Sequence, residues 1–158
     1  MAGVLEFTDD LFLNTDVYIM TYKGEEPFKI RRFIVPLFKD MMEISGSKVY
    51  PLYLGWDMTD GTYKAKWMAD KKLDNWSKLR LQIWCWGEAD TGRANWMKAK
   101  VVGHLCTKYT YANSIQKSMW YTYSYIFYDK QRAKYANEGR RLMVAIWREI
   151  QKKYGMRT

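Results

Sequence analysis

The stretch KLRLQIWCWG, residues 78–87, decides the fold class because apolar residues occupy every second position. Side chains of a β-strand alternate between its two faces. One face of this strand is apolar and consists of Leu79, Leu81, Ile83 and Cys85. The other face consists of Arg80, Gln82, Trp84 and Trp86. The stretch therefore predicts a strand with one buried face and a second face that bears two indoles and a cation.

The same two-residue alternation continues in both directions along the chain. It predicts strands at 62–70 and 95–111, and a last strand at 118–128. The apolar side of these strands is expected to contain Tyr63, Ala65, Trp67, Met97, Ala99, Val101, Tyr121, Tyr123 and Tyr125. Gly103 lies in the middle of an unusually long strand, where we expect a bulge or a bend that could reverse the alternation beyond it.

Helical spacing appears at the two ends of this run of strands. Residues 27–45 have an apolar stripe at steps of three and four, with Pro27 suited to a helix start. Pro36 removes an internal hydrogen bond, so we expect either a kink or two short helices that meet near Val35. A long helix is predicted from Asp129 to Lys153, with Gly155 as its stop.

These elements predict one α+β domain over residues 1–158. A strand at 16–23 and an edge strand at 48–56, marked by Pro51, complete the set. The expected architecture is a twisted antiparallel sheet of about six strands, in β-α-β-β-β-β-β-α order, that grips the long C-terminal helix.

In the order of its elements, the chain resembles the helix-grip fold of START and Bet v 1-like proteins. The resemblance covers the helical region 27–45, the strands over 49–129 and the helix over 130–154. The glycine-rich loop of plant Bet v 1 relatives is missing, and GWDMTDG stands in its place. The resemblance implies a curved sheet around the last helix, with an internal pocket for a small apolar or amphipathic molecule.

The leading functional hypothesis is a non-enzymatic protein that binds such a molecule between sheet and helix. Bulky aromatic residues beside Ala and Gly leave room for a groove, and buried tyrosine hydroxyls need polar partners. The expected pocket residues are Trp67, Ile83, Cys85, Val101, Tyr121, Tyr123, Tyr125, Leu142 and Ile146. The alternative is that the tyrosines reach past a packed core to its rim.

The second sheet face supports a different hypothesis. It combines indoles with cations, namely Arg80, Trp84, Trp86, Trp96, Lys98, Lys100 and His104. Residues 62–158 hold 20 Lys and Arg against 7 Asp and Glu, whereas residues 1–61 hold 6 against 10. An anionic partner such as single-stranded nucleic acid fits this pattern, although a basic surface also serves solubility. Another subunit, a membrane surface or an element of the same chain could equally cover the tryptophans.

The sequence offers little for catalysis or for metal binding. Two cysteines and one histidine are too few for a structural zinc site, so no metal and no cofactor is expected. Cys85 and Cys106 are expected to be reduced and buried, with a disulfide as the alternative. A pair of His104 with Cys106 is conceivable but has no local signature, and Glu88 and Asp90 fit a solvated hairpin. The absence of a long apolar segment and of a basic N-terminal signal predicts a cytoplasmic location.

Overall fold

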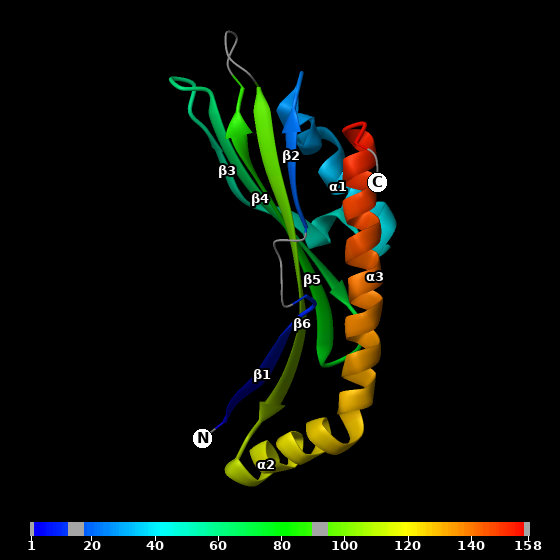
Figure 1. Cartoon of the computed structure of the whole chain (residues 1–158). Helices are drawn as coiled ribbons and strands as arrows, with labels where there is room; N and C mark the ends of the chain where they lie inside the picture. The colour runs from blue at the N-terminus through cyan, green and yellow to red at the C-terminus, as the bar shows by residue number, and fades with distance from the viewer. Residues whose placement is uncertain (1, 13–17, 90–94, 157–158) are drawn as a thin grey trace.

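A computed structural model describes residues 2–12, 18–89 and 95–156 of the chain. It has an α+β architecture in which a six-stranded antiparallel sheet packs against a long C-terminal helix. The helices of the core lie on one face of this sheet, and the opposite face is left open (Figure 1). The predicted fold class is confirmed.

The strands follow each other closely along the chain. They are β1 (Gly3–Asp10), β2 (Ile19–Lys23), β3 (Val49–Trp56), β4 (Thr62–Lys72), β5 (Ser77–Glu88) and β6 (Trp96–Tyr111). Their order in the sheet is β1-β6-β5-β4-β3, and β2 also pairs with β6. β1 and β2 share one edge of β6, since β1 pairs with residues 104–111 and β2 with residues 96–100.

The helices occupy the connections and the C-terminus. They are α1 (Ile30–Met42), which follows a 3-10 turn at Pro27–Lys29, then α2 (Ser114–Tyr123), a π-helical turn (Ser124–Tyr128) and α3 (Asp129–Lys153). α3 ends where Gly155 adopts a φ of 67°, which favours glycine, so the predicted stop of this helix is confirmed. The predicted start at Asp129 as an N-cap is wrong, because α3 continues from the π-helical turn without a break and no side chain caps it.

The alternation predicted for β4, β5 and the first part of β6 is confirmed. Odd-numbered residues from Tyr63 to Ala69, from Leu79 to Cys85 and from Met97 to Leu105 are buried, and most of them pack beneath α1 and α3. Tyr109 is buried in a second cluster with Leu5 and Tyr128. The apolar stripe of α1, formed by Ile30, Ile34, Phe38 and Met42, completes this core. We refer to the sheet face that contacts the helices as the core face, and to the opposite one as the outer face.

The strand predicted at 118–128 is wrong, because residues 114–128 are helical. The side chain of Asn113 caps this helix by accepting a hydrogen bond of 2.8 Å from the backbone N–H of Gln116. Apolar residues stand on both parities of this stretch, so its apparent alternation was weak evidence for a strand. Trp120, Tyr123 and Tyr128, which recur at near-helical spacing, face the sheet instead.

The sixth strand is β1, which the sequence analysis missed. Its residues alternate correctly, with Leu5 buried on the core face opposite Tyr109. The acidic Asp9 and Asp10 at its end resemble a solvated tail in sequence, but Asp9 pairs with Arg132 of α3. Long-range pairing of this kind has no local sequence signal.

The bulge predicted at Gly103 is also wrong. The register of β5 with β6 runs without interruption through the pair Leu81–Gly103. A Cβ at Gly103 would stand 2.5 Å from Cδ1 of Leu11 and 2.9 Å from Cδ2 of Leu81. The glycine serves close packing, because Leu11 fills the space that a side chain would take.

Pro36 lies inside a helix and Pro51 lies in a strand at the edge of the sheet. α1 runs as one helix through Pro36, so the alternative of two short helices near Val35 is wrong. Pro51 lies in the edge strand β3, where a missing N–H donor costs no ladder bond, and the pairing with β4 shifts between Pro51 and Tyr53. The edge position predicted from Pro51 is confirmed.

Candidate functional site

The candidate site lies on the outer face, where the strand register arranges aromatic and basic side chains in rows. Lys66 of β4 pairs with Trp84 of β5, which pairs with Lys100 of β6. Tyr53 of β3 and Ile19 of β2 extend this row at its two ends. The neighbouring row reads Gly55, Lys64, Trp86, Lys98 and Thr21. Neither row contains an acidic residue.

We call Lys64, Lys66, Trp84, Trp86, Trp96, Lys98 and Lys100 the indole face. Trp84 is 42% exposed, while Trp86 and Trp96 are half-buried. The ammonium of Lys66 stands 3.9 Å from the ring centroid of Trp84, close enough for a cation–π interaction. Lysine stems therefore shield part of the indoles, and the described helices of the chain lie on the other side of the sheet (Figure 1).

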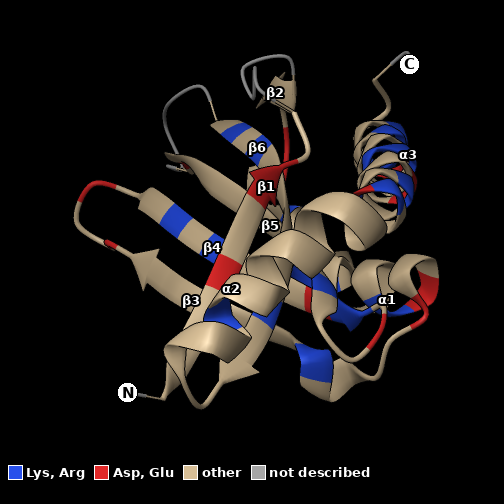
Figure 2. Cartoon of the chain, turned by 90° about the horizontal axis from the view of Figure 1, so that it is seen from below, with Lys and Arg blue, Asp and Glu red and all other residues tan. Residues whose placement is uncertain are grey.

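The described part of the chain covers the three tryptophans of the indole face only in part. The indole nitrogen of Trp96 donates to Glu88 Oε2 at 3.4 Å. Trp84 keeps the largest exposed fraction of the three indoles. Figure 2 shows Lys and Arg on both β4 and β6. A partner with flat apolar groups and negative charge would complement this surface.

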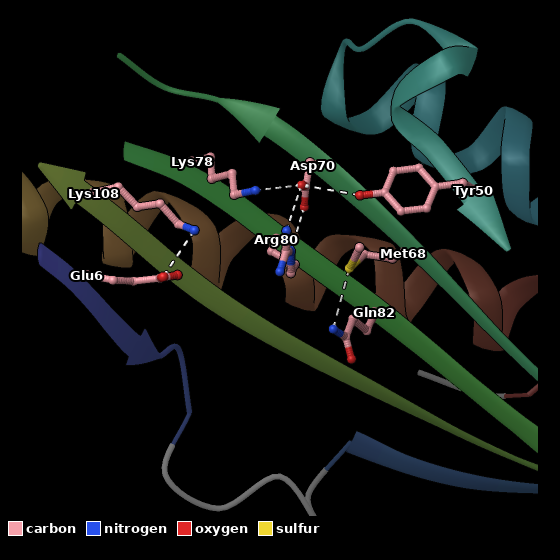
Figure 3. A network of polar contacts seen from close by, with 8 residues as sticks. All are labelled: Glu6, Tyr50, Met68, Asp70, Lys78, Arg80, Gln82 and Lys108. Carbon is pink, nitrogen blue, oxygen red and sulfur yellow. Dashed lines mark hydrogen bonds and ion pairs between the residues drawn. The ribbon is translucent and has the colours of Figure 1, made fainter. Parts of the chain in front are cut away.

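An ion-pair network occupies a second part of the outer face (Figure 3). Asp70 accepts from Arg80 Nε at 2.8 Å and from Arg80 Nη2 at 3.0 Å, and its Oδ2 lies 3.0 Å from Lys78 Nζ. The hydroxyl of Tyr50 donates to the same carboxylate at 3.4 Å. Burial alone would raise the pKa of Asp70, but the hydrogen bonds from Arg80 and Lys78 outweigh it and hold the pKa below its usual value.

Arg80, which the sequence assigned to the binding surface, is therefore engaged within the protein. Its hydrogen bonds to Asp70 raise its own pKa, so the guanidinium is permanently charged and held in place. Near it, Gln82 Nε2 lies 3.6 Å from the sulfur of Met68, and Lys108 pairs with Glu6 at 3.0 Å (Figure 3). This network separates the indole face from the end of the sheet near Cys106.

A hollow of about 380 Å³ lies beyond the network, at the turn between β4 and β5. Four lysines line it, namely Lys48, Lys72, Lys78 and Lys108. Asp70 and Asp74 partly offset their charge. This hollow has no signal in the local sequence, because its lysines are spread over four elements and only the fold brings them together.

His104 and Cys106 do not form the conceivable catalytic pair. The Nδ1 atom of His104 contacts Asp10 Oδ1 at 2.6 Å across the β1–β6 pairing. Cys106 is buried on the outer face, whereas Cys85 is buried on the core face. Both cysteines are free, as expected, and their opposite sides of the sheet rule out a bridge between them. Burial raises the pKa of the Cys85 thiol, so it is protonated and a poor nucleophile.

The predicted ligand pocket is not assembled from all of its residues. Its members from the sheet and α3 belong to one packed core cluster, where Leu142 is half-buried and the others are buried: Trp67, Ile83, Cys85, Val101, Leu142 and Ile146. The three tyrosines lie elsewhere because their segment is helical. Tyr121 and Tyr125 are exposed, and Tyr123 packs in a separate aromatic cluster with Trp76 and Trp120.

The described residues offer neither a metal-binding cluster nor a membrane-spanning helix. Residues 2–12, 18–89 and 95–156 contain no group of three or more His, Cys, Asp or Glu that could hold a metal ion. Within the same ranges, the helices are too short or too polar for a transmembrane span.

Comparisons with known proteins add little to this geometry. The chain matches no family model and no curated protein. A solved structure of an uncharacterized protein from Rhizobium leguminosarum is similar at 10% identity, over 92% of this chain and 99% of that chain, with a TM-score of 0.19. A similarity of this size carries no argument, so the helix-grip relationship stays a prediction.

Proposed function

We propose that this protein binds single-stranded nucleic acid on the indole face of its sheet. The observation that carries the proposal is the position of Trp84, a 42% exposed indole with the ammonium of Lys66 3.9 Å from its ring centroid and with Lys64 and Lys98 in the neighbouring row. This arrangement offers a base a surface for stacking and offers phosphates a cation nearby.

The spacing of the rows suits an extended strand of nucleic acid. Trp84 and Trp86 are two residues apart on one strand, which separates them by about 7 Å along the sheet. Neighbouring strands are about 4.8 Å apart, so Lys66 and Lys100 stand about 10 Å from each other across Trp84. Two unstacked neighbouring bases can span the first distance while the phosphates follow the lysines.

The same chemistry predicts weak sequence preference. Stacking on an aromatic ring contributes about 1–3 kcal/mol per base and depends little on which base is bound. If Lys64, Lys66, Lys98 and Lys100 each contact one phosphate, single-strand affinity should fall about fifty-fold between 50 and 200 mM salt.

The test is binding of a fluorescently labelled oligonucleotide, measured by anisotropy at several salt concentrations. A Trp84→Ala variant should lose affinity roughly five- to 150-fold, which corresponds to the stacking free energy of one base. Trp56→Ala is the matched control, because Trp56 is 49% exposed and faces the other side of the sheet beside Tyr63 and Phe28. Equal affinity of wild type and both variants would contradict the proposal.

Binding of a small apolar molecule between sheet and α3 stays a prediction. Ile83, Val101 and Ile146 are fully buried, so a ligand would have to displace packed side chains. An increase in melting temperature with ligand concentration would support it. Self-association through the indole face is the further alternative, and sedimentation at several concentrations would detect it. The buried, free cysteines fit a cytoplasmic location, which also stays a prediction.

A further inference from the structure

The outward side of α2 and of the π-helical turn bears a large apolar surface. Its members are between 48% and 85% exposed, and we call them the apolar helix face: Ile115, Met119, Tyr121, Tyr125, Ile126 and Phe127. The segment crosses one end of the molecule, where it leads into the start of α3 (Figure 1). Large apolar side chains gathered on one surface usually mark a site of interaction.

The exposure does not result from a loosely placed helix. Trp120 stacks on Tyr109 with ring centroids 4.7 Å apart, and its indole N–H donates to the carbonyl of Thr110 at 2.9 Å. Tyr128 is buried and donates to Asp74 Oδ2. The π-helical turn brings Tyr123 and Tyr128, which are five residues apart, onto the same inner side, where their rings stack. The inner side is thus fixed, and the apolar helix face is held outward.

Charge distinguishes between the possible partners of this face. Lys117 is the one charged residue among residues 114–128, and exposed Lys130 and Lys134 follow on the first turns of α3 beside Asp129. Figure 2 shows α2 without the red of Asp and Glu. The whole chain has a net charge of +9, so two copies repel each other whereas an anionic surface attracts each copy.

Composition and shape also favour a lipid surface. Tyrosine rings prefer the boundary between lipid and water, because the ring is apolar and the hydroxyl is polar. A groove of about 490 Å³ opens on the same face, lined by Phe7, Tyr121, Tyr125 and Ile126 among others. Arg132 at this groove is paired with Asp9 and lies over the ring of Phe7, so its charge is neutralised.

We propose that the apolar helix face docks on an anionic membrane surface, with α2 lying parallel to the membrane plane and its aromatic side chains in the interface. Basic residues beside the face attract the headgroups, and the apolar side chains supply the burial. This proposal is independent of nucleic-acid binding, since the indole face lies on the outer side of the sheet.

The experiment is co-sedimentation with vesicles of phosphatidylcholine alone and of phosphatidylcholine with 30% phosphatidylserine, at about 100 mM salt. Wild type should bind the anionic vesicles and bind the neutral ones more weakly. The double variant Tyr125→Ser, Phe127→Ser should lose at least about tenfold in vesicle affinity, because two exposed apolar side chains no longer enter the interface. Met58→Ser is the matched control and should bind as wild type, since Met58 is 91% exposed but lies in the turn between β3 and β4.

Two further measurements make the result decisive. The double variant should keep the melting temperature and the oligonucleotide affinity of wild type, whereas Trp84→Ala should keep vesicle binding. Failure of wild type to bind anionic vesicles, or equal binding by the double variant, would overturn the proposal. A wild-type dimer that the double variant converts to a monomer would also overturn it, in favour of a second copy as the partner.

Discussion

The packing of α3 on the sheet predicts that Gly103→Ala destabilises the protein. The new methyl carbon would stand 2.5 Å from Leu11 Cδ1, 2.9 Å from Leu81 Cδ2 and 3.0 Å from Met143 Sδ. Ordinary contacts are about 3.5–4.0 Å, so these side chains must move by about 0.5–1.5 Å. Leu11, Leu81 and Met143 are all fully buried, and the expected loss in the free energy of unfolding is about 1–3 kcal/mol.

The assay is equilibrium unfolding in urea, with Gly46→Ala as the control. A Cβ at Gly46 would meet no heavy atom within 4 Å, so this variant should change stability by less than about 0.5 kcal/mol. The reasoning is refuted if Gly103→Ala is as stable as wild type.

A double-mutant cycle sharpens the test. Leu11→Ala alone should cost about 2–5 kcal/mol, because it leaves a cavity in the core. In the Gly103→Ala background the added methyl occupies part of that space. The double variant should therefore be more stable than the sum of the single changes predicts, and strict additivity would mean that Leu11 does not lie over Gly103.

Three further outcomes follow from the geometry. Asp70→Asn should lower the free energy of unfolding by about 1–3 kcal/mol. Because the folded pKa of Asp70 lies below its unfolded value, this contribution is present above about pH 4 and is lost as the pH falls through the folded pKa. Urea unfolding from pH 7 to pH 3 should therefore show that the difference between wild type and variant shrinks. Asn113→Ala should lower the free energy of unfolding by about 1 kcal/mol, because it removes the cap of α2, whereas Asn113→Asp should retain most of the stability. An equal loss of stability in both variants would contradict the cap. Neither thiol should react with a thiol reagent in the native protein, because Cys85 and Cys106 are buried, and both should react in denaturant; rapid native labelling of either one would contradict the described burial.

The sequence predicted the sheet best where one physical rule acted alone. From Tyr63 to Cys85, alternating apolar residues could lie on one face only, and a shift by one residue would have exposed them all. The same parity holds through Gly103 to Tyr109. The glycine was misinterpreted because its neighbour Leu11 comes from a distant part of the chain, and local sequence does not reveal such a contact.

Residues 114–128 show where the two-residue pattern misleads. Apolar residues on both odd and even positions fit a strand and a helix equally well, so the alternation contained little information there. The better signal was Asn113 followed three residues later by Gln116, which is typical of a helix start. Assigning this segment as a strand also placed Tyr121, Tyr123 and Tyr125 in a pocket that the fold does not assemble.

The candidate binding surface was predicted in part. Trp84, Trp86, Trp96, Lys98 and Lys100 follow from parity and lie on the outer face as expected. Arg80 and His104 share that face, but carboxylates engage them. Asp70 and Asp10 belong to other strands, and only the register shows that they lie opposite these cations.

Nucleic-acid binding by the indole face is tested most directly by comparing Trp84→Ala with Trp56→Ala for affinity toward a labelled single-stranded oligonucleotide at 50 and 200 mM salt. The account predicts that wild type and Trp56→Ala bind alike and weaken steeply with salt, about fifty-fold over this range, while Trp84→Ala binds at least about fivefold more weakly at both concentrations. Binding that is insensitive to salt, or a Trp84→Ala variant that binds as tightly as Trp56→Ala, would contradict it.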